Sequence, residues 1–179
     1  QSITPRYEFG FGLSYTTFEY SDLAITTIYS ADYAQTDLIL SWENGGASPI
    51  AEGSTTALWL HMPAHKVTFD TKSTGALYSG EARPSTTLFC AHYWQPSFQI
   101  PQLYIHRPPS TGEPPSFIKG FTSVEVSPGQ TTSASITLSR YDLSIWDVVR
   151  QGWAKPGGII TFSVGASSRD FRLSGTIPA

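Results

Sequence analysis

Residues 122–139, TSVEVSPGQTTSASITLS, carry the clearest structural signal in the chain. Apolar residues alternate with polar ones on both sides of an SPGQ turn: Val124 and Val126 before it, and Ala134, Ile136 and Leu138 after it. A period of two is typical of β-strands with one buried face. Because Pro and Gly mark a turn between the two runs, the stretch predicts a β-hairpin.

The same alternation recurs elsewhere from residue 64 onward, in runs bounded by Gly and Pro. These runs are HKVTFDTK (65–72), QLYIH (102–106), GIITFSVGASS (158–168) and DFRLSGTI (170–177). The alternation breaks at residues 141–149, YDLSIWDVV, where Leu143, Trp146 and Val149 are three apart behind Asp142. We expect one or two helical turns there, with Asp142 as N-cap. Several short strands without long helices predict an all-β antiparallel β-sandwich, the architecture that includes the immunoglobulin fold.

Such a sandwich needs only about 100 residues, and the chain has 179. We therefore expect irregular insertions at about residues 30–63 and 82–100, which lack a sustained period. Within the first insertion, DYAQTDLILSW (32–42) predicts a short helix with Leu38, Ile39 and Trp42 on one side.

Composition excludes several classes of function. A net charge of −3 and a pI near 5.7 give no basic surface for nucleic acid. No apolar run approaches the roughly 20 residues of a membrane-spanning helix, so no membrane partner is expected. The single cysteine, Cys90, excludes an internal disulfide and a cysteine-rich zinc site. Gln1 is compatible with a processed N-terminus or with the cut end of a longer chain.

The N-terminal stretch PRYEFGFGLSYTTF (5–18) is unusually aromatic for a chain terminus, which is normally polar and frayed. It contains Tyr7, Phe9, Phe11, Tyr15 and Phe18. Each large ring kept in water forgoes roughly 1.5–3 kcal/mol of burial free energy. Either this segment folds back on the sandwich, or it packs against a partner.

Seven short motifs occur in an order that resembles a known domain. They are FGFGLSYTTF (9–18), PQLYI (101–105), GEPP (112–115), KGF (119–121), SPGQ (127–130), DLSIWD (142–147) and GASSRD (165–170). Together they resemble the C-terminal fibronectin type III-like domain of fungal glycoside hydrolase family 3 β-glucosidases. The resemblance implies that residues 1–18 connect to a preceding α/β domain and that residues 19–179 form the sandwich. Tyr7, Phe9, Phe11, Tyr15 and Phe18 are then the candidate docking surface.

The chain departs from this family at two places. Ser73-Thr74-Gly75 stands where the family usually has Asn-Thr-Gly, which puts a local side-chain cap in doubt. Residues 82–100 separate two strand-like runs that the family joins more directly, and they fit either a lineage-specific loop or a translated intron.

The resemblance implies that the aspartate nucleophile and the glutamate acid/base lie in two preceding domains, so no catalytic residue is assigned here. The acidic residues of this chain are interpreted as structural: Glu43, Glu52, Glu113, Asp142, Asp147 and Asp170. His61 and His65 are separated by Pro63, which prevents the regular helix that would align them as metal ligands. Cys90 and His92 lack further ligands nearby, and Ser167 and Ser168 lack a histidine base. We expect no metal and no cofactor.

Two functions remain. The favoured one is a non-catalytic accessory domain of a secreted, extracellular β-glucosidase, which docks on the catalytic domains and stabilises them. The alternative is a module that binds polysaccharide or lignin through exposed aromatic side chains, with Trp42, Trp59, Tyr93 and Trp94 as candidates. Trp146 and Trp153 are interpreted as core or lid residues.

Overall fold

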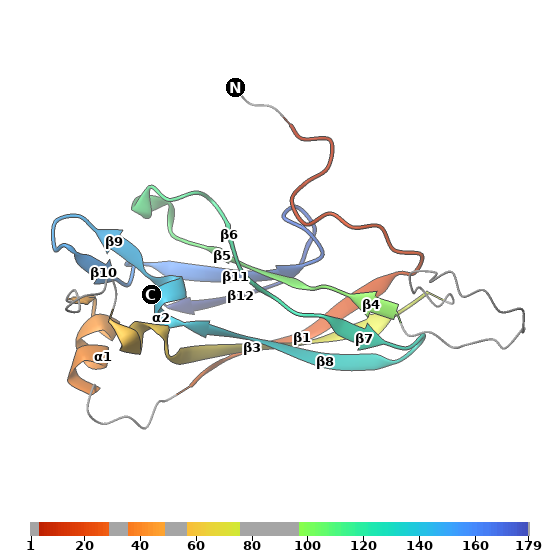
Figure 1. Cartoon of the computed structure of the whole chain (residues 1–179), viewed down its shortest axis with the longest axis horizontal. Coiled ribbons are helices and arrows are strands. Elements are labelled where there is room, and N and C mark those ends of the chain that lie inside the picture. Colours follow the sequence, from red (N-terminus) through yellow and green to blue (C-terminus); the bar gives the residue numbers. More distant parts are fainter. Residues whose placement is uncertain (1–3, 29–35, 49–56, 76–96, 179) are drawn as a thin grey trace, which may run out of the picture.

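The computed structural model describes residues 4–28, 36–48, 57–75 and 97–178. Two antiparallel sheets form the body of the molecule and lie one above the other in Figure 1. The first has the order β1-β3-β8 and consists of β1 (Phe18–Thr27), β3 (Pro63–Ser73) and β8 (Thr131–Ser139). The second has the order β12-β11-β5-β6 and consists of β5 (Gln102–His106), β6 (Phe117–Phe121), β11 (Ile159–Gly165) and β12 (Phe171–Pro178).

Smaller elements complete the described part of the fold. One small sheet has the order β2-β10-β9, with β2 (Ala47–Ser48), β9 (Ile145–Asp147) and β10 (Gly152–Ala154). Another pairs β4 (Ser97–Gln99) with β7 (Val124–Val126). The helical elements are α1 (Thr36–Glu43), α2 (Arg140–Leu143) and the 3-10 turns η2 (Leu58–His61) and η3 (Pro109–Thr111). No helix in these described ranges has the length and apolar character needed to cross a membrane.

The core lies between the two large sheets. Alternate residues of the first sheet face alternate residues of the second, and all of them are buried: Val67, Phe69, Ile136 and Leu138 against Leu103, Ile105, Ile160, Phe162 and Val164. Because a strand places successive side chains on opposite faces, the period of two in the sequence selected these residues correctly. The predicted all-β sandwich is therefore confirmed.

The predicted hairpin at residues 122–139 is wrong in its pairing. β8 pairs with β3, whereas β7 pairs with β4. Gly129 does form a turn at φ +73°, but its N–H donates to the Ser73 carbonyl (2.9 Å), and the Ser73 N–H donates to the Gln130 carbonyl (3.2 Å). The turn thus packs on the end of β3, and the chain changes sheets instead of folding back on itself.

The prediction for residues 141–149 is also wrong in detail. Helix α2 begins earlier, and Ser139 is its N-cap: the Ser139 hydroxyl accepts the Asp142 N–H while the Asp142 carboxylate accepts the Ser139 N–H. Such a reciprocal capping box satisfies two free donors at the helix start. Trp146 does not continue this helix, because it lies in strand β9 opposite Trp153.

The first predicted insertion contains the expected short helix. In α1, Trp42 is buried and Ile39 is half-buried, whereas Leu38 is exposed. Glu43 accepts a hydrogen bond from Arg140 Nε (3.1 Å) and lies 3.4 Å from Lys155 Nζ. Part of the second insertion belongs to the sheet structure, because its residues 97–99 form β4. Residues 82–96, where we weighed a loop against a translated intron, lie outside the described residues.

Candidate docking surface

The N-terminal segment, residues 4–17, runs across the outside of the second sheet, next to the loop between β11 and β12 (Figure 1). Three hydrogen bonds hold it there. The Phe9 carbonyl accepts the Ser168 N–H (3.0 Å), the Gly10 carbonyl accepts a Gln102 Nε2–H (3.0 Å), and the Glu8 carboxylate accepts the Ser167 hydroxyl (2.9 Å). These contacts come from main-chain, amide, hydroxyl and carboxylate groups, so polar groups fix the segment to the sandwich.

Gln102 is the central residue of this attachment. Its side chain is buried on the outer face of β5, where Nε2 donates to the carbonyls of Gly10 and Ala166 (both 3.0 Å) and Oε1 accepts the Tyr104 hydroxyl (2.6 Å). The amide thereby connects the N-terminal segment, the β11–β12 loop and the sheet. This role of Gln102 was not predicted. The sequence signal for it is a polar residue at the start of the otherwise apolar strand QLYI.

Gly10 is required by this packing. It has φ +78°, in the left-handed region, and a Cβ there would overlap the Gln102 side chain. The backbone of the FGFG stretch therefore approaches the sandwich closely at Gly10, where glycine tolerates the positive φ. It does not do so at Gly12, where a Cβ would meet nothing within 4 Å.

The aromatic rings of the segment remain largely exposed, and two of them stack on each other. Phe9 is 66% exposed and Phe11 is 44% exposed, and the rings of Tyr7 and Phe11 stack with centroids 5.2 Å apart. Tyr15 is exposed. Phe18 differs, because it is half-buried at the first position of β1. The structure thus brings Tyr7 and Phe11 together, leaves Phe9 exposed, and places Phe18 in the sandwich.

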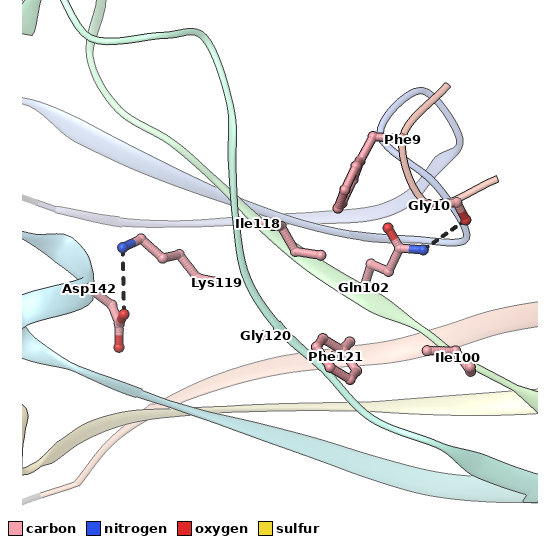
Figure 2. Close-up of a pocket in the computed structure, with 9 residues that line it drawn as sticks. All are labelled: Phe9, Gly10, Ile100, Gln102, Ile118, Lys119, Gly120, Phe121 and Asp142. Carbon is pink, nitrogen blue, oxygen red and sulfur yellow. Dashed lines mark hydrogen bonds and ion pairs between the residues drawn. The ribbon is translucent and has the colours of Figure 1, made fainter. Parts of the chain in front are cut away.

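A groove of about 540 Å³ lies below Phe9 (Figure 2). Its lining comes from the N-terminal segment, from the start of β5 and the residues before it, from β6 and from α2: Phe9, Gly10, Ile100, Gln102, Ile118, Lys119, Gly120, Phe121 and Asp142. Phe121 and Ile100 are exposed. At one end Lys119 Nζ lies 3.6 Å from the Asp142 carboxylate. The groove is therefore an apolar depression with one ion pair at its margin, continuous with the exposed face of Phe9.

Phe121 and Ile100, both exposed, and the half-buried Ile118 are groove residues that were not predicted from the sequence. The signal was present in FIKGF (117–121), a strand with apolar residues on both faces. Gly120 allows β6 to lie close to the first sheet, since a Cβ there would be 2.5 Å from Ile136 Cγ2.

Two of the four predicted stacking residues are wrong. Trp42 in α1 and Trp59 in η2 are 1% and 3% exposed, because both side chains pack in the core. Neither ring has a surface on which a sugar or lignin unit can stack. Tyr93 and Trp94 lie outside the described residues.

Acidic side chains that we considered for catalysis hold basic side chains in place. The pairs are Glu43 with Arg140 and Lys155, Glu113 with Arg107, Asp142 with Lys119, Asp147 with Arg150, and Asp170 with Arg172. The hydrogen bond from Arg172 lowers the pKa of the Asp170 carboxyl, and the backbone N–H of Arg150 lowers the pKa of Asp147. The partner of Asp170 is thus Arg172 and not the adjacent Arg169. Glu52 lies outside the described residues.

Within the described residues, no three His, Cys, Asp or Glu side chains are grouped so that they could hold a metal ion. Ser167, which we considered as a nucleophile, instead accepts the backbone N–H of Asp170 (3.1 Å) and donates to Glu8. Its hydroxyl closes the turn before β12. Cys90 and His92 lie outside the described residues.

Comparison with known proteins gives a consistent result. Residues 99–168 match the family model of the fibronectin type III-like domain. The chain is 37% identical over 173 residues to probable β-glucosidase G of Aspergillus terreus, and 37% identical over 177 residues to β-glucosidase cel3A of Pyricularia oryzae. These matches cover 96% and 99% of this chain but only 18% of either relative.

Solved structures agree. The crystal structure of β-D-glucoside glucohydrolase from Trichoderma reesei matches 98% of this chain with a TM-score of 0.71 and 33% identity, again over only 20% of its own length. β-Glucosidase D2-BGL from Chaetomella raphigera has the same TM-score and 32% identity. The chain thus spans about a fifth of the relatives it matches. Residues 99–168 belong to the fibronectin type III-like family, and nearly the whole chain resembles one such domain of fungal β-glucosidases.

Proposed function

We propose that the chain is a non-catalytic C-terminal accessory domain of a secreted glycoside hydrolase family 3 β-glucosidase. In that enzyme the preceding domains hydrolyse terminal β-D-glucosyl residues, as in cellobiose released from cellulose. This domain docks on the catalytic domains and stabilises them. The N-terminal segment is the connection to those domains and, with the groove beside it, forms the docking surface.

The observation that carries this proposal is that Phe9 is exposed yet fixed. Its ring is 66% exposed, while the carbonyls of Phe9 and Gly10 are both hydrogen-bonded to the sandwich. An exposed ring on a frayed terminus would indicate nothing about a partner. A ring whose backbone is hydrogen-bonded to the sandwich supports a surface prepared for a partner. Covering one such side chain completely contributes roughly 1.5–3 kcal/mol, and a prepared surface loses less conformational entropy on docking.

The test uses the full-length enzyme that contains this chain. The double variant Phe9→Ser/Phe11→Ser should shorten its half-life at an inactivating temperature several-fold, because the rate of irreversible unfolding rises when an interdomain contact is weakened. Its kcat/KM for a β-glucoside at 25 °C should stay within two-fold.

A matched control is Val148→Ser/Val149→Ser, which also replaces two exposed apolar residues. These lie in the β9–β10 turn, far from the N-terminal segment in Figure 1. The control should leave the half-life unchanged. An unchanged half-life in the Phe9/Phe11 variant would contradict the docking assignment.

A second candidate function is the binding of polysaccharide or lignin by exposed rings. Trp42 and Trp59 are buried and do not support it, but a different group of aromatic residues near β9 and β10 favours it.

A further inference from the structure

Four aromatic rings are in successive contact beside the β9–β10 hairpin. The rings of Trp146 and Trp153 lie 5.5 Å apart at 73°, those of Trp153 and Tyr141 4.7 Å apart at 67°, and those of Tyr141 and His61 4.6 Å apart. Trp146 and Trp153 are directly opposite each other in the antiparallel pair, so their side chains project from the same face. Residues from β9, β10, α2 and η2 thus form one aromatic column.

The column extends from the core to the surface. Tyr141 and Trp153 are half-buried and pack against the main hydrophobic core, whereas Trp146 is 36% exposed. Edge-to-face contacts of this kind are favourable and orient each ring. Trp146 is therefore an exposed indole whose orientation is set by the rings behind it.

The hairpin under Trp146 is itself well fixed. The Asp147 carboxylate accepts the backbone N–H groups of Val149 (2.9 Å) and Arg150 (3.0 Å), and Arg150 Nη1 donates to the Gly45 carbonyl (2.6 Å). Lys155, which follows β10, pairs with Glu43 of α1. A ligand on Trp146 would consequently meet a surface that needs little ordering on binding.

The surroundings of Trp146 fit a sugar ring. A pyranose presents a small face of C–H groups with hydroxyls at its edge, so it can stack on the exposed part of the indole. Arg150 and Gln151 are exposed in the turn that follows β9. One donor of each is bonded, to the Gly45 and Val148 carbonyls, and their remaining N–H groups can donate to sugar hydroxyls.

We propose that Trp146, supported by Trp153 and Tyr141, is a stacking site for a glucosyl unit of a β-linked glucan chain. The choice of a glucan rests on the proposed function of the chain as part of a β-glucosidase. The site would hold the enzyme near polymer that carries its substrate, and it is distinct from the N-terminal docking surface.

The test measures binding of cellohexaose to the 179-residue chain by titration calorimetry, together with retention on cellulose. The wild-type chain should bind with a millimolar or lower Kd, and Trp146→Ala should weaken binding roughly ten-fold. Trp146→Phe, which keeps a smaller ring and preserves the hairpin, should lie between the two. The matched control Phe121→Ala removes another exposed ring, in the N-terminal groove, and should bind within two-fold of wild type. Circular dichroism confirms that each variant is folded.

Three outcomes would overturn the proposal: no binding of cellohexaose or cellulose by the wild-type chain, equal binding by folded Trp146→Ala, or retention on lignin without retention on cellulose. None of these depends on docking, which is measured by the half-life of the full-length enzyme. The two proposals can therefore fail separately.

Discussion

Replacing Phe9 and Phe11 in the isolated chain tests whether these rings stabilise the sandwich itself. Phe9 buries about a third of its surface and Phe11 a little more than half. Full burial of a Phe contributes roughly 1.5–3 kcal/mol, so the two together account for at most about 3 kcal/mol. Part of the Phe11 burial is against Tyr7 of the same segment, which lowers the contribution to the sandwich further. We expect Phe9→Ser/Phe11→Ser to reduce the free energy of unfolding by about 1–2 kcal/mol.

Urea unfolding followed by tryptophan fluorescence measures this value, and Phe162→Ala calibrates it. Phe162 is fully buried between the sheets, and its truncation should cost about 3–5 kcal/mol because it leaves a cavity. The midpoint of the Phe9/Phe11 variant should fall clearly less than that of Phe162→Ala, with an unchanged m-value. A loss as large as that of Phe162→Ala would show that Phe9 and Phe11 belong to the core, and it would refute the docking assignment.

Three further predictions follow from buried polar groups and from β4. The buried Thr71 hydroxyl has no hydrogen-bond partner among the described residues, so Thr71→Val should raise the free energy of unfolding by about 1 kcal/mol in the urea assay. Ser144→Ala is the contrasting variant. It loses a 2.9 Å hydrogen bond to the Arg140 carbonyl and should lower the free energy of unfolding by a similar amount. Burial lowers the pKa of His65 from 6.5. Because the unfolded chain then binds the proton more readily, the free energy of unfolding should fall as the pH drops below about 6.5, and His65→Gln should flatten this slope between pH 7.5 and 5. Deletion of residues 82–96 should preserve cooperative thermal unfolding, whereas deletion of residues 82–99 removes β4 and should lower the midpoint or abolish the transition.

The sequence predicted the core better than the connections. Alternation identified Val67, Phe69, Ile136 and Leu138, because side-chain direction in a strand depends only on position along the chain. The partner of each strand depends on residues far away. The SPGQ turn shows this. The Gln130 N–H donates to the Ser127 carbonyl (2.9 Å) and closes the turn as expected, but the strands on its two sides pair with β4 and β3 and not with each other. For α2, Ser139 followed three residues later by Asp142 is the sequence pattern of a capping box. The prediction of Asp142 as N-cap missed that Asp142 is the third helical residue and Ser139 the cap.

Aromatic residues show the same limit more sharply. Trp42, Trp59 and Trp146 have the same side chain, yet the first two are in the core and the third reaches solvent. Residue type gives the free energy available from burial, and only the packing of α1, η2 and β9 decides where that burial occurs. Trp42 and Trp59 were therefore wrong as exposed stacking residues. Of the two tryptophans interpreted as core or lid, Trp153 packs against the core and Trp146 is partly exposed.

The N-terminal segment differs from an ordinary frayed terminus in a way that bears on its role. Ordering each residue of a chain end costs about 1–2 kcal/mol of backbone entropy. Rings that stay in water contribute little burial free energy to offset this cost. Here the side chains of Gln102 and Ser167 and the Ser168 N–H meet acceptors of the segment, at Gly10, Glu8 and Phe9. Gln102 is buried, so loss of the segment would remove the Gly10 carbonyl that accepts one N–H of its side-chain amide. A buried donor without an acceptor is unfavourable. The sandwich thus holds the segment through polar groups and leaves its rings outward, an arrangement that favours a partner on that side over a second layer of core.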